Sequence, residues 1–269
     1  MNFNDTIVAA ATPYGYGGLA VVRLSGNEST SIAKKICLRD KFFKERHATV
    51  VTLYASNDEP FDEAVVTFFK SPNSYTGEDV VELSCHGSPT IVEQIIELSI
   101  NLGARSAEPG EFTRRAFING KVDLVQAESV AAVIQSQGEK SAKMTHRVLS
   151  GELSNKLNDI KQNIVEALSY VEFEIDVSED ELVPDAVERI QKNVSFAYCS
   201  ISALTESFRE GRMLNRGASV VITGPTNVGK STLFNALLNE NKAIINPAPG
   251  TTRDTIEAAV IYEGISVVY

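Results

Sequence analysis

The 269-residue sequence is short of cysteine, of long apolar runs and of basic charge. Its three cysteines, Cys37, Cys85 and Cys199, are widely spaced and contain no Cys-x-x-Cys pair, which argues against a disulfide framework and a zinc site. No apolar run approaches the roughly 20 residues of a membrane span. The N-terminus has no basic segment before its apolar stretch, so it does not resemble a signal peptide. We therefore expect a reduced, cytoplasmic protein that does not enter a membrane.

The formal net charge is −10 at pH 7, so the chain lacks the basic surplus that is typical of nucleic-acid binders. Residues 151–214 hold 13 acidic residues against 6 basic ones. A solvated helical face and an acidic docking surface both explain this excess, and the first is the simpler explanation. If the protein acts on RNA, other parts of the machinery are expected to supply most of the phosphate contacts.

The most informative motif is GPTNVGKS at residues 224–231, which matches the phosphate-binding loop G-x-x-x-x-G-K-[ST]. The apolar run at 219–223 predicts a buried strand before it, and residues 232–238 predict a helix after it. Backbone N–H groups and the helix N-terminus would surround the phosphates. Lys230 would contact the β- and γ-phosphates, and the Ser231 hydroxyl would ligate magnesium.

A second motif, NPAPGTTRD at residues 246–254, favours GTP over ATP. Its prolines and glycine predict a loop, and apolar runs at 255–261 and 265–269 predict two strands joined by a turn. A phosphate loop, a helix, a threonine-bearing loop and a strand hairpin are the opening of a GTPase fold. The same loop, and the lack of an acceptor-site motif, argue against a phosphate-loop kinase.

Only 53 residues follow position 216, whereas a phosphate-loop domain of this type needs on the order of 160. The sequence contains no Asp-x-x-Gly box and no Asn-Lys-x-Asp box, which would select guanine. We therefore expect residues 217–269 to be the truncated start of an α/β GTPase domain. This chain is expected to be inactive alone.

Residues 1–119 mix strand and helix patterns and predict an α+β domain. Strands are expected at residues 6–11, 19–24, 49–54, 63–69 and 80–85, and helices at residues 29–37 and 89–102.

From residue 120 to 216 the pattern becomes that of an all-α bundle of long helices. Apolar residues recur at i, i+3, i+4 and i+7 through 124–149, 153–175 and 184–214. Gly151 marks the first junction and residues 178–183 mark the second.

Three N-terminal segments are distinctive together: ATPYGYGGLAVVRLSG at 11–26, YTGEDVVELSCHG at 75–87 and PGEFTRRAFINGKVDLVQAE at 109–128. With NVGKSTLFN and PGTTRD, they resemble the MnmE (TrmE) family of tRNA-modifying GTPases along the whole chain and in the right order. The resemblance implies a folate-binding domain that dimerises, then a helical domain with a GTPase domain inserted into it.

The resemblance also implies that Arg23, Glu82 and Lys121 bind a 5,10-methylene- or 5-formyl-tetrahydrofolate. A carboxylate such as Glu82 can accept two hydrogen bonds from the amide and amino edge of a pterin, while Arg23 and Lys121 suit anionic groups. Each of the three could instead form a surface or interdomain salt bridge. We expect His86 to be structural, because no partner carboxylate or metal-ligand spacing accompanies it.

For the nucleotide, the resemblance implies a GTP site that carries magnesium and potassium. Magnesium would be held by Ser231 and Thr252. Potassium would be held by Asn227, Asn246, Ala248 and Thr251, where other GTPases place an arginine finger. The GTP contacts implied are Asn227, Val228, Gly229, Lys230, Ser231, Thr232, Asn246, Pro247, Ala248, Pro249, Gly250, Thr251 and Thr252. The glutamate that positions water in the family is expected beyond Tyr269, so no catalytic residue is assigned.

Members of the family form a homodimer and work with an FAD-dependent, MnmG-like partner in a heterotetramer. Together they add an aminomethyl-type group to carbon 5 of the wobble uridine of certain tRNAs, and the folate supplies one carbon. The alternative is a ribosome-assembly GTPase, which shares the phosphate-loop motifs. Such proteins usually carry the GTPase domain first, and they are not expected to bind folate.

Overall fold

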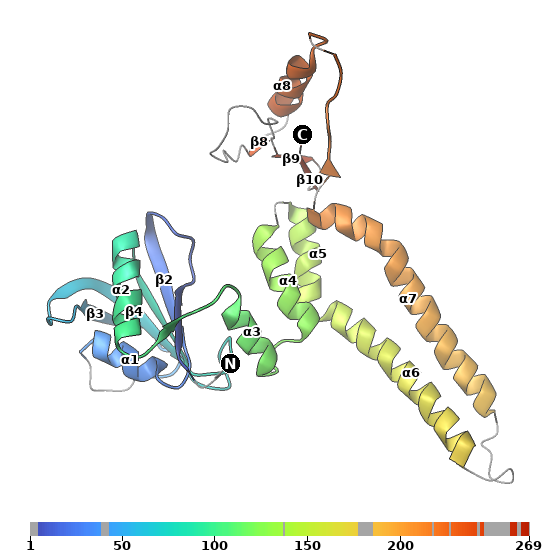
Figure 1. Ribbon diagram of the computed structural model, residues 1–269, viewed down its shortest axis with the longest axis horizontal. Coiled ribbons are helices and arrows are strands. Elements are labelled where there is room, and N and C mark those ends of the chain that lie inside the picture. The colour runs from blue at the N-terminus through green and yellow to red at the C-terminus, as the bar shows by residue number, and fades with distance from the viewer. Residues whose placement is uncertain are drawn as a thin grey trace. The chain divides into compact units, whose positions relative to one another are not determined.

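The computed structural model describes residues 5–38, 43–136, 138–176, 185–216, 218–225, 227–240, 243–244, 259–262 and 265–268. The chain divides into two compact units, Met1–Ala127 and Glu128–Tyr269 (Figure 1). In the described ranges, no helix combines the length and the apolar character that crossing a membrane requires.

The first unit is built on one six-stranded sheet with the strand order β3-β4-β5-β2-β1-β6. Neighbouring strands are antiparallel, except that β6 runs parallel to β1. The strands are β1 (Ile7–Ala10), β2 (Gly17–Ser25), β3 (Thr49–Tyr54), β4 (Pro60–Phe69), β5 (Val80–Gly87) and β6 (Arg105–Ser106).

The core of this unit lies on one face of the sheet. Val22 and Leu24 of β2 are fully buried there, while Arg23 between them is only half-buried. Helices α1 (Ser29–Ile36) and α2 (Pro89–Asn101) pack on β5, and α2 also packs on β2. Because side chains alternate between the faces of a strand, Arg23 belongs to the face opposite this core.

A short helix, α3 (Glu111–Ile118), follows the two-residue strand β6 (Figure 1). Neither element was predicted from the sequence. Neither is long enough for apolar periodicity to show, because α3 covers about two turns and β6 a single pair of residues. The position of α3 depends on ion pairs with residues distant in the sequence.

The long helices lie mainly in the second unit, and one of the helices predicted there is two helices in the structure. A single helix over 124–149 was expected, and the structure has α4 (Leu124–Gln135) and α5 (Glu139–Leu149) instead. Gly138 between them is extended, at φ −122° and ψ 153°, and glycine is a poor helix former. Apolar residues keep their helical spacing across Gly138, so the sequence pattern did not reveal the break between α4 and α5.

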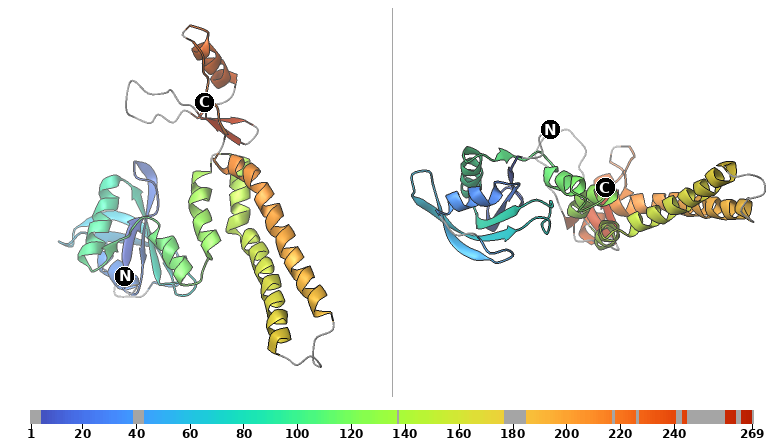
Figure 2. Two further views of the ribbon diagram at one scale, coloured as in Figure 1. Left: turned by 45° about the vertical axis from the view of Figure 1, so that its right-hand side comes forward. Right: turned by 90° about the horizontal axis from the view of Figure 1, so that it is seen from below.

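Two further helices, α6 (Glu152–Asp176) and α7 (Ala186–Arg216), pack along each other (Figure 2). The predicted junction at Gly151 is confirmed, since α5 ends at Leu149 and α6 begins at Glu152. The second predicted junction, residues 178–183, lies outside the described residues.

After α7 the chain begins a second sheet, with the order β7-β10-β9-β8. Its elements are β7 (Ala218–Ser219), α8 (Lys230–Glu240), β8 (Ala243–Ile244), β9 (Ala259–Tyr262) and β10 (Ile265–Val268). The predicted strand 219–223 is wrong in extent, because β7 ends at Ser219. That residue pairs with Val268, the last residue of β10.

The predicted fold class is confirmed: an α+β part, then long helices, then the start of an α/β part in which a helix follows a parallel strand. The domain boundaries after residues 119 and 216 stay predictions.

Candidate functional site

Two of the three predicted folate residues form a direct pair. Arg23 of β2 and Glu82 of β5 are opposite each other in the antiparallel register. Arg23 Nε donates to Glu82 Oε1 at 2.8 Å, and Nη2 lies 2.7 Å from the same oxygen. Both side chains are about one quarter exposed, so the pair is open to solvent on the face opposite the core.

Two aromatic rings flank this pair. The Arg23 guanidinium carbon lies 5.1 Å from the ring centroid of Tyr75 and 5.7 Å from that of Phe112. These distances are within the range of a cation–π interaction. Neither ring was predicted from the sequence to lie at the site. Each lies inside a motif segment of the resemblance, but nothing in its spacing indicated a contact with Arg23.

The third predicted residue, Lys121, contacts the segment that carries Tyr75, residues 71–79. Lys121 Nζ donates to the carbonyl oxygen of Pro72 at 2.9 Å. Its methylene groups cover Gly77, where an added Cβ would lie 3.2 Å from Lys121 Cγ. Arg23, through Tyr75, and Lys121 therefore meet the same short segment.

A buried ion cluster fixes the surroundings of this segment. Arg115 of α3 is 1% exposed and donates to Glu78 at 3.1 Å, to Glu111 at 3.1 Å and to Asp5 at 2.6 Å. Arg105 donates to both carboxylate oxygens of Glu111, at 2.7 and 3.0 Å. These hydrogen bonds from Arg105, followed by those from Glu108 N–H and Arg115, lower the pKa of Glu111 to about 2 despite its burial.

The expectation that His86 has no carboxylate partner was wrong. Its Nδ1 lies 2.6 Å from Asp62 Oδ1, and its backbone N–H donates to Asp62 Oδ2 at 3.1 Å. The Asp62 side chain is almost buried, whereas the imidazole is exposed. Asp62 thus binds both the ring and the backbone at the end of β5. The two residues are 24 positions apart, with no periodic pattern that links them, which explains why the contact was not predicted.

The phosphate-binding motif forms a turn before α8. Gly224, Asn227 and Gly229 all have positive φ, at 155°, 64° and 94°. Lys230, the first residue of α8, donates from Nζ to the carbonyl oxygens of Gly224 and Pro225, at 3.1 and 2.6 Å. The ammonium group therefore lies against the carbonyl oxygens at the start of the loop.

The predicted nucleotide and metal contacts fall into two groups. Asn227, Val228, Gly229, Lys230, Ser231 and Thr232 are described and lie consecutively in the loop and the first turn of α8. Asn246, Pro247, Ala248, Pro249, Gly250, Thr251 and Thr252 lie outside the described residues. In the described part of the chain, no cluster of three His, Cys, Asp or Glu side chains could hold a metal ion.

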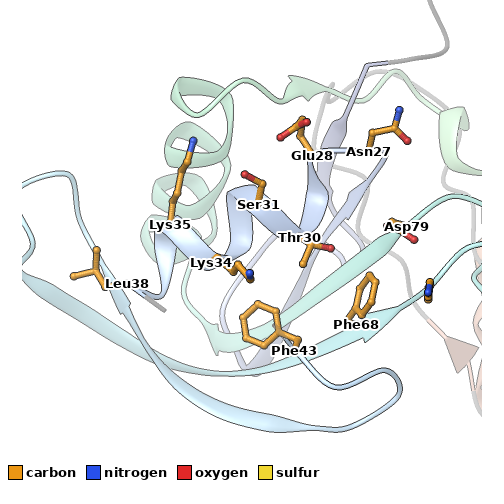
Figure 3. A pocket seen from close by; sticks show the side chains of 11 residues that line it. Asn27, Glu28, Thr30, Ser31, Lys34, Lys35, Leu38, Phe43, Phe68 and Asp79 are labelled. Atoms are coloured by element: carbon orange, nitrogen blue, oxygen red, sulfur yellow. The ribbon is translucent and has the colours of Figure 1, made fainter. Parts of the chain in front are cut away.

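A separate cavity of 940 Å³ lies beside α1 in the first unit (Figure 3). None of the predicted site residues lines it. Its lining combines aromatic rings with lysines and carboxylates: Asn27, Glu28, Thr30, Ser31, Lys34, Lys35, Leu38, Phe43, Phe68, Lys70 and Asp79.

Comparison with known proteins gives two family matches. Residues 6–121 match the family described as the GTP-binding protein TrmE N-terminus, and residues 124–263 match the MnmE helical domain.

Among curated relatives, the tRNA modification GTPase MnmE of Aquifex aeolicus is 42% identical over 263 residues, which are 98% of this chain and 59% of the relative. The protein of that name from Aliarcobacter butzleri is 44% identical over 257 residues, or 96% of this chain and 57% of the relative. That of a Thermotoga species is 44% identical over 265 residues, or 97% and 57%. The chain thus spans less than two thirds of the length of these relatives.

Proposed function

Because this chain belongs to the MnmE (TrmE) family of tRNA modification GTPases, we propose that its first unit binds a reduced folate and that its phosphate loop binds GTP. The complete protein then acts in the cytoplasm as a homodimer with an FAD-dependent partner. It adds an aminomethyl-type group to carbon 5 of the tRNA wobble uridine, with one carbon taken from 5,10-methylene- or 5-formyl-tetrahydrofolate.

The observation that supports folate binding best is the Arg23–Glu82 pair. Within the described chain their hydrogen bond uses Arg23 Nε and Glu82 Oε1, which leaves Arg23 Nη1 and Glu82 Oε2 for a ligand. A donor beside an acceptor suits the carbonyl and N–H groups of a pterin edge. A partly exposed ion pair contributes only about 0–1 kcal/mol to stability, so stability alone gives little reason to place these charges here.

Lys121 extends the site toward an anionic group. Among the described residues, its ammonium group is held by a single carbonyl oxygen, that of Pro72, and the residue is exposed. An ammonium group has three donors, so two remain for a carboxylate such as those of the folate glutamate tail.

For the nucleotide, the Nζ of Lys230 lies against the carbonyl oxygens of the phosphate loop. On binding, its Nζ exchanges the carbonyl oxygens of Gly224 and Pro225 for phosphate oxygens. We assign magnesium to Ser231 and Thr252, and potassium to Asn227 with Asn246, Ala248 and Thr251. The potassium ion offsets charge that develops in the transition state.

The 269-residue chain itself is expected to bind GTP weakly and to show no potassium-stimulated turnover. Its sequence has neither an Asp-x-x-Gly nor an Asn-Lys-x-Asp box. A loop without those supporting elements must be ordered at the moment of binding, which lowers the affinity.

Turnover of GTP in potassium and then in sodium, by this chain and by the full-length Aquifex aeolicus relative, tests this assignment. We expect potassium-stimulated hydrolysis by the relative alone. Equal turnover by both would contradict the role given to the absent motifs. Equal GTP turnover by the relative in potassium and in sodium would contradict potassium assistance.

The second candidate, a ribosome-assembly GTPase, accounts for the phosphate loop but not for the Arg23–Glu82 pair in a matched TrmE N-terminal segment. Folate binding separates the two, because the ribosome factor is expected to show none.

A further inference from the structure

The Arg23 side chain carries the two ring contacts and the Glu82 contact at once. Glu82 fixes the Nε side of the guanidinium, and the rings of Tyr75 and Phe112, here called the aromatic pair, lie 5.1 and 5.7 Å from its carbon. Glu82 alone would leave the plane of the guanidinium free to tilt, because Nε and Nη2 contact the same acceptor oxygen, which defines one edge only. The rings restrict the plane of the guanidinium as well.

The two rings come from different elements that are joined to each other. Tyr75 belongs to the segment 71–79 and Phe112 to α3, and the Tyr75 hydroxyl lies 2.8 Å from the Thr113 hydroxyl of α3. This hydroxyl contact joins the two elements directly beside the rings of Tyr75 and Phe112, and it therefore restricts the distance between the rings.

The buried ion cluster ties the same two elements together a second time. Arg115 donates to Glu78 in the segment that carries Tyr75, and to Glu111, the neighbour of Phe112. Asn119, at the end of α3, donates to the carbonyl oxygen of Thr76 at 2.7 Å. Three independent contacts thus hold the segment against α3, with the aromatic pair on the two sides of the junction.

We propose that Tyr75 and Phe112 are positioning residues that orient the Arg23 guanidinium, so that its Nη1 edge meets an acceptor group of the folate. The inference rests on the proposed folate site. A guanidinium that is oriented before the ligand arrives loses less side-chain entropy on binding, so the aromatic pair raises affinity without touching the acceptor group.

Calorimetric titration of the full 269-residue chain with 5-formyl-tetrahydrofolate measures the effect. Replacement of either ring, in Tyr75→Leu or Phe112→Leu, is expected to weaken binding on the order of 10-fold. Tyr75→Phe keeps the ring and loses the contact with Thr113, and it is expected to recover most of the affinity. Tyr54→Leu, on the distant edge strand β3, is the matched control and is expected to leave affinity unchanged.

A second measurement follows Arg23 without any ligand. In a protein labelled with nitrogen-15 arginine, the Arg23 Nε–H signal, assigned from Arg23→Lys, should be sharp and shifted by ring currents. In Tyr75→Leu and Phe112→Leu the signal should broaden and lose that shift, and in Tyr75→Phe it should be retained.

An unchanged Arg23 signal in both leucine variants overturns the proposal, as does unchanged folate affinity in them. If the unaltered chain binds no folate, the proposed function fails, while the ligand-free signal still decides whether the rings orient Arg23. If Phe112→Leu does not fold, the Tyr75→Leu and Tyr75→Phe pair decides.

Discussion

Among single residues, Glu111 and Arg115 form the centre of the buried ion cluster. Both side chains are at most 2% exposed, and each makes several charge-assisted hydrogen bonds. A buried ion pair need not be more stabilising than an apolar pair, but removal of one partner leaves the other charge buried and unpaired. Substitutions here are therefore expected to be costly.

The pH dependence of stability follows from Glu111. Its pKa falls from 4.5 in the unfolded chain to about 2 in the fold. A lowered pKa stabilises the fold above about pH 4.5, and this contribution is lost as the pH falls through about 2. Allowing for solvent screening of Arg105, which is 45% exposed, we expect Glu111 to contribute roughly 2 kcal/mol at neutral pH.

Replacement of Glu111 by glutamine removes that contribution. Glu111→Gln should lower the unfolding free energy of the first unit by roughly 2 kcal/mol at pH 7, and the difference should shrink between pH 4.5 and 2. Hydrogen exchange of the Val22 and Leu24 amides reports on this unit alone. If the loss of unfolding free energy in Glu111→Gln is the same at every pH, Glu111 acts by packing rather than by its charge.

The site illustrates what a sequence reveals at this scale. Arg23, Glu82 and Lys121 were predicted from motif segments, and the structure brings the first two into contact. Tyr75, Phe112 and Asp62 were missed, because their contacts join positions 24 to 89 residues apart and follow no periodic pattern. Such contacts depend on strand register and on where α3 lies.

At the scale of elements, the pairing of β2 with β5 includes two opposed glycines that leave no room for a side chain on Gly87. Gly17 is opposite Gly87, and an added Cβ on Gly87 would lie 2.5 Å from the Gly17 carbonyl oxygen and 2.7 Å from its carbon. Both are backbone atoms, so the clash cannot be relieved by rotation of a side chain. The register that places Arg23 opposite Glu82 shifts by one residue between Ala20 and Gly17, before the strands reach this glycine pair.

Gly87→Ala is therefore expected to destabilise the first unit by about 1–3 kcal/mol. Gly18→Ala is the matched control, because nothing lies within 4 Å of its added Cβ, and it should change stability by less than about 0.5 kcal/mol. Urea unfolding of both variants compares them. Equal stability of the two would show that the strands separate here at little cost.

Elements were predicted well where one face of a regular segment packs on a core. The strand 49–54 was predicted with its observed bounds, and helix α2 to within one residue. Prediction failed where tertiary contacts decide, at α3 and β6, and where an apolar pattern crossed a break, between α4 and α5. Residues 219–223 are mostly apolar, as a buried strand requires, but the partner strand β10 ends opposite Ser219, and β7 ends there too.

At the scale of the whole molecule, the connection between β1 and β2 exposes two aromatic side chains. Tyr14 is 78% exposed and Tyr16 is 92% exposed. The family resemblance led us to expect a homodimer through this unit, and these rings are suitable for such a contact. Sedimentation equilibrium of the chain at micromolar concentration should give a dimer. A monomer at every concentration would contradict the expectation.

The most direct test of the central claim is a calorimetric titration of this chain with 5-formyl-tetrahydrofolate. We predict saturable binding of one ligand per chain, weakened in Arg23→Ala by about 1–3 kcal/mol, or about 5- to 150-fold. Lys35→Ala, which removes a cation that lines the separate cavity beside α1, should leave the affinity unchanged. No heat of binding, or equal affinity in the Arg23→Ala protein, would contradict a folate site at the Arg23–Glu82 pair.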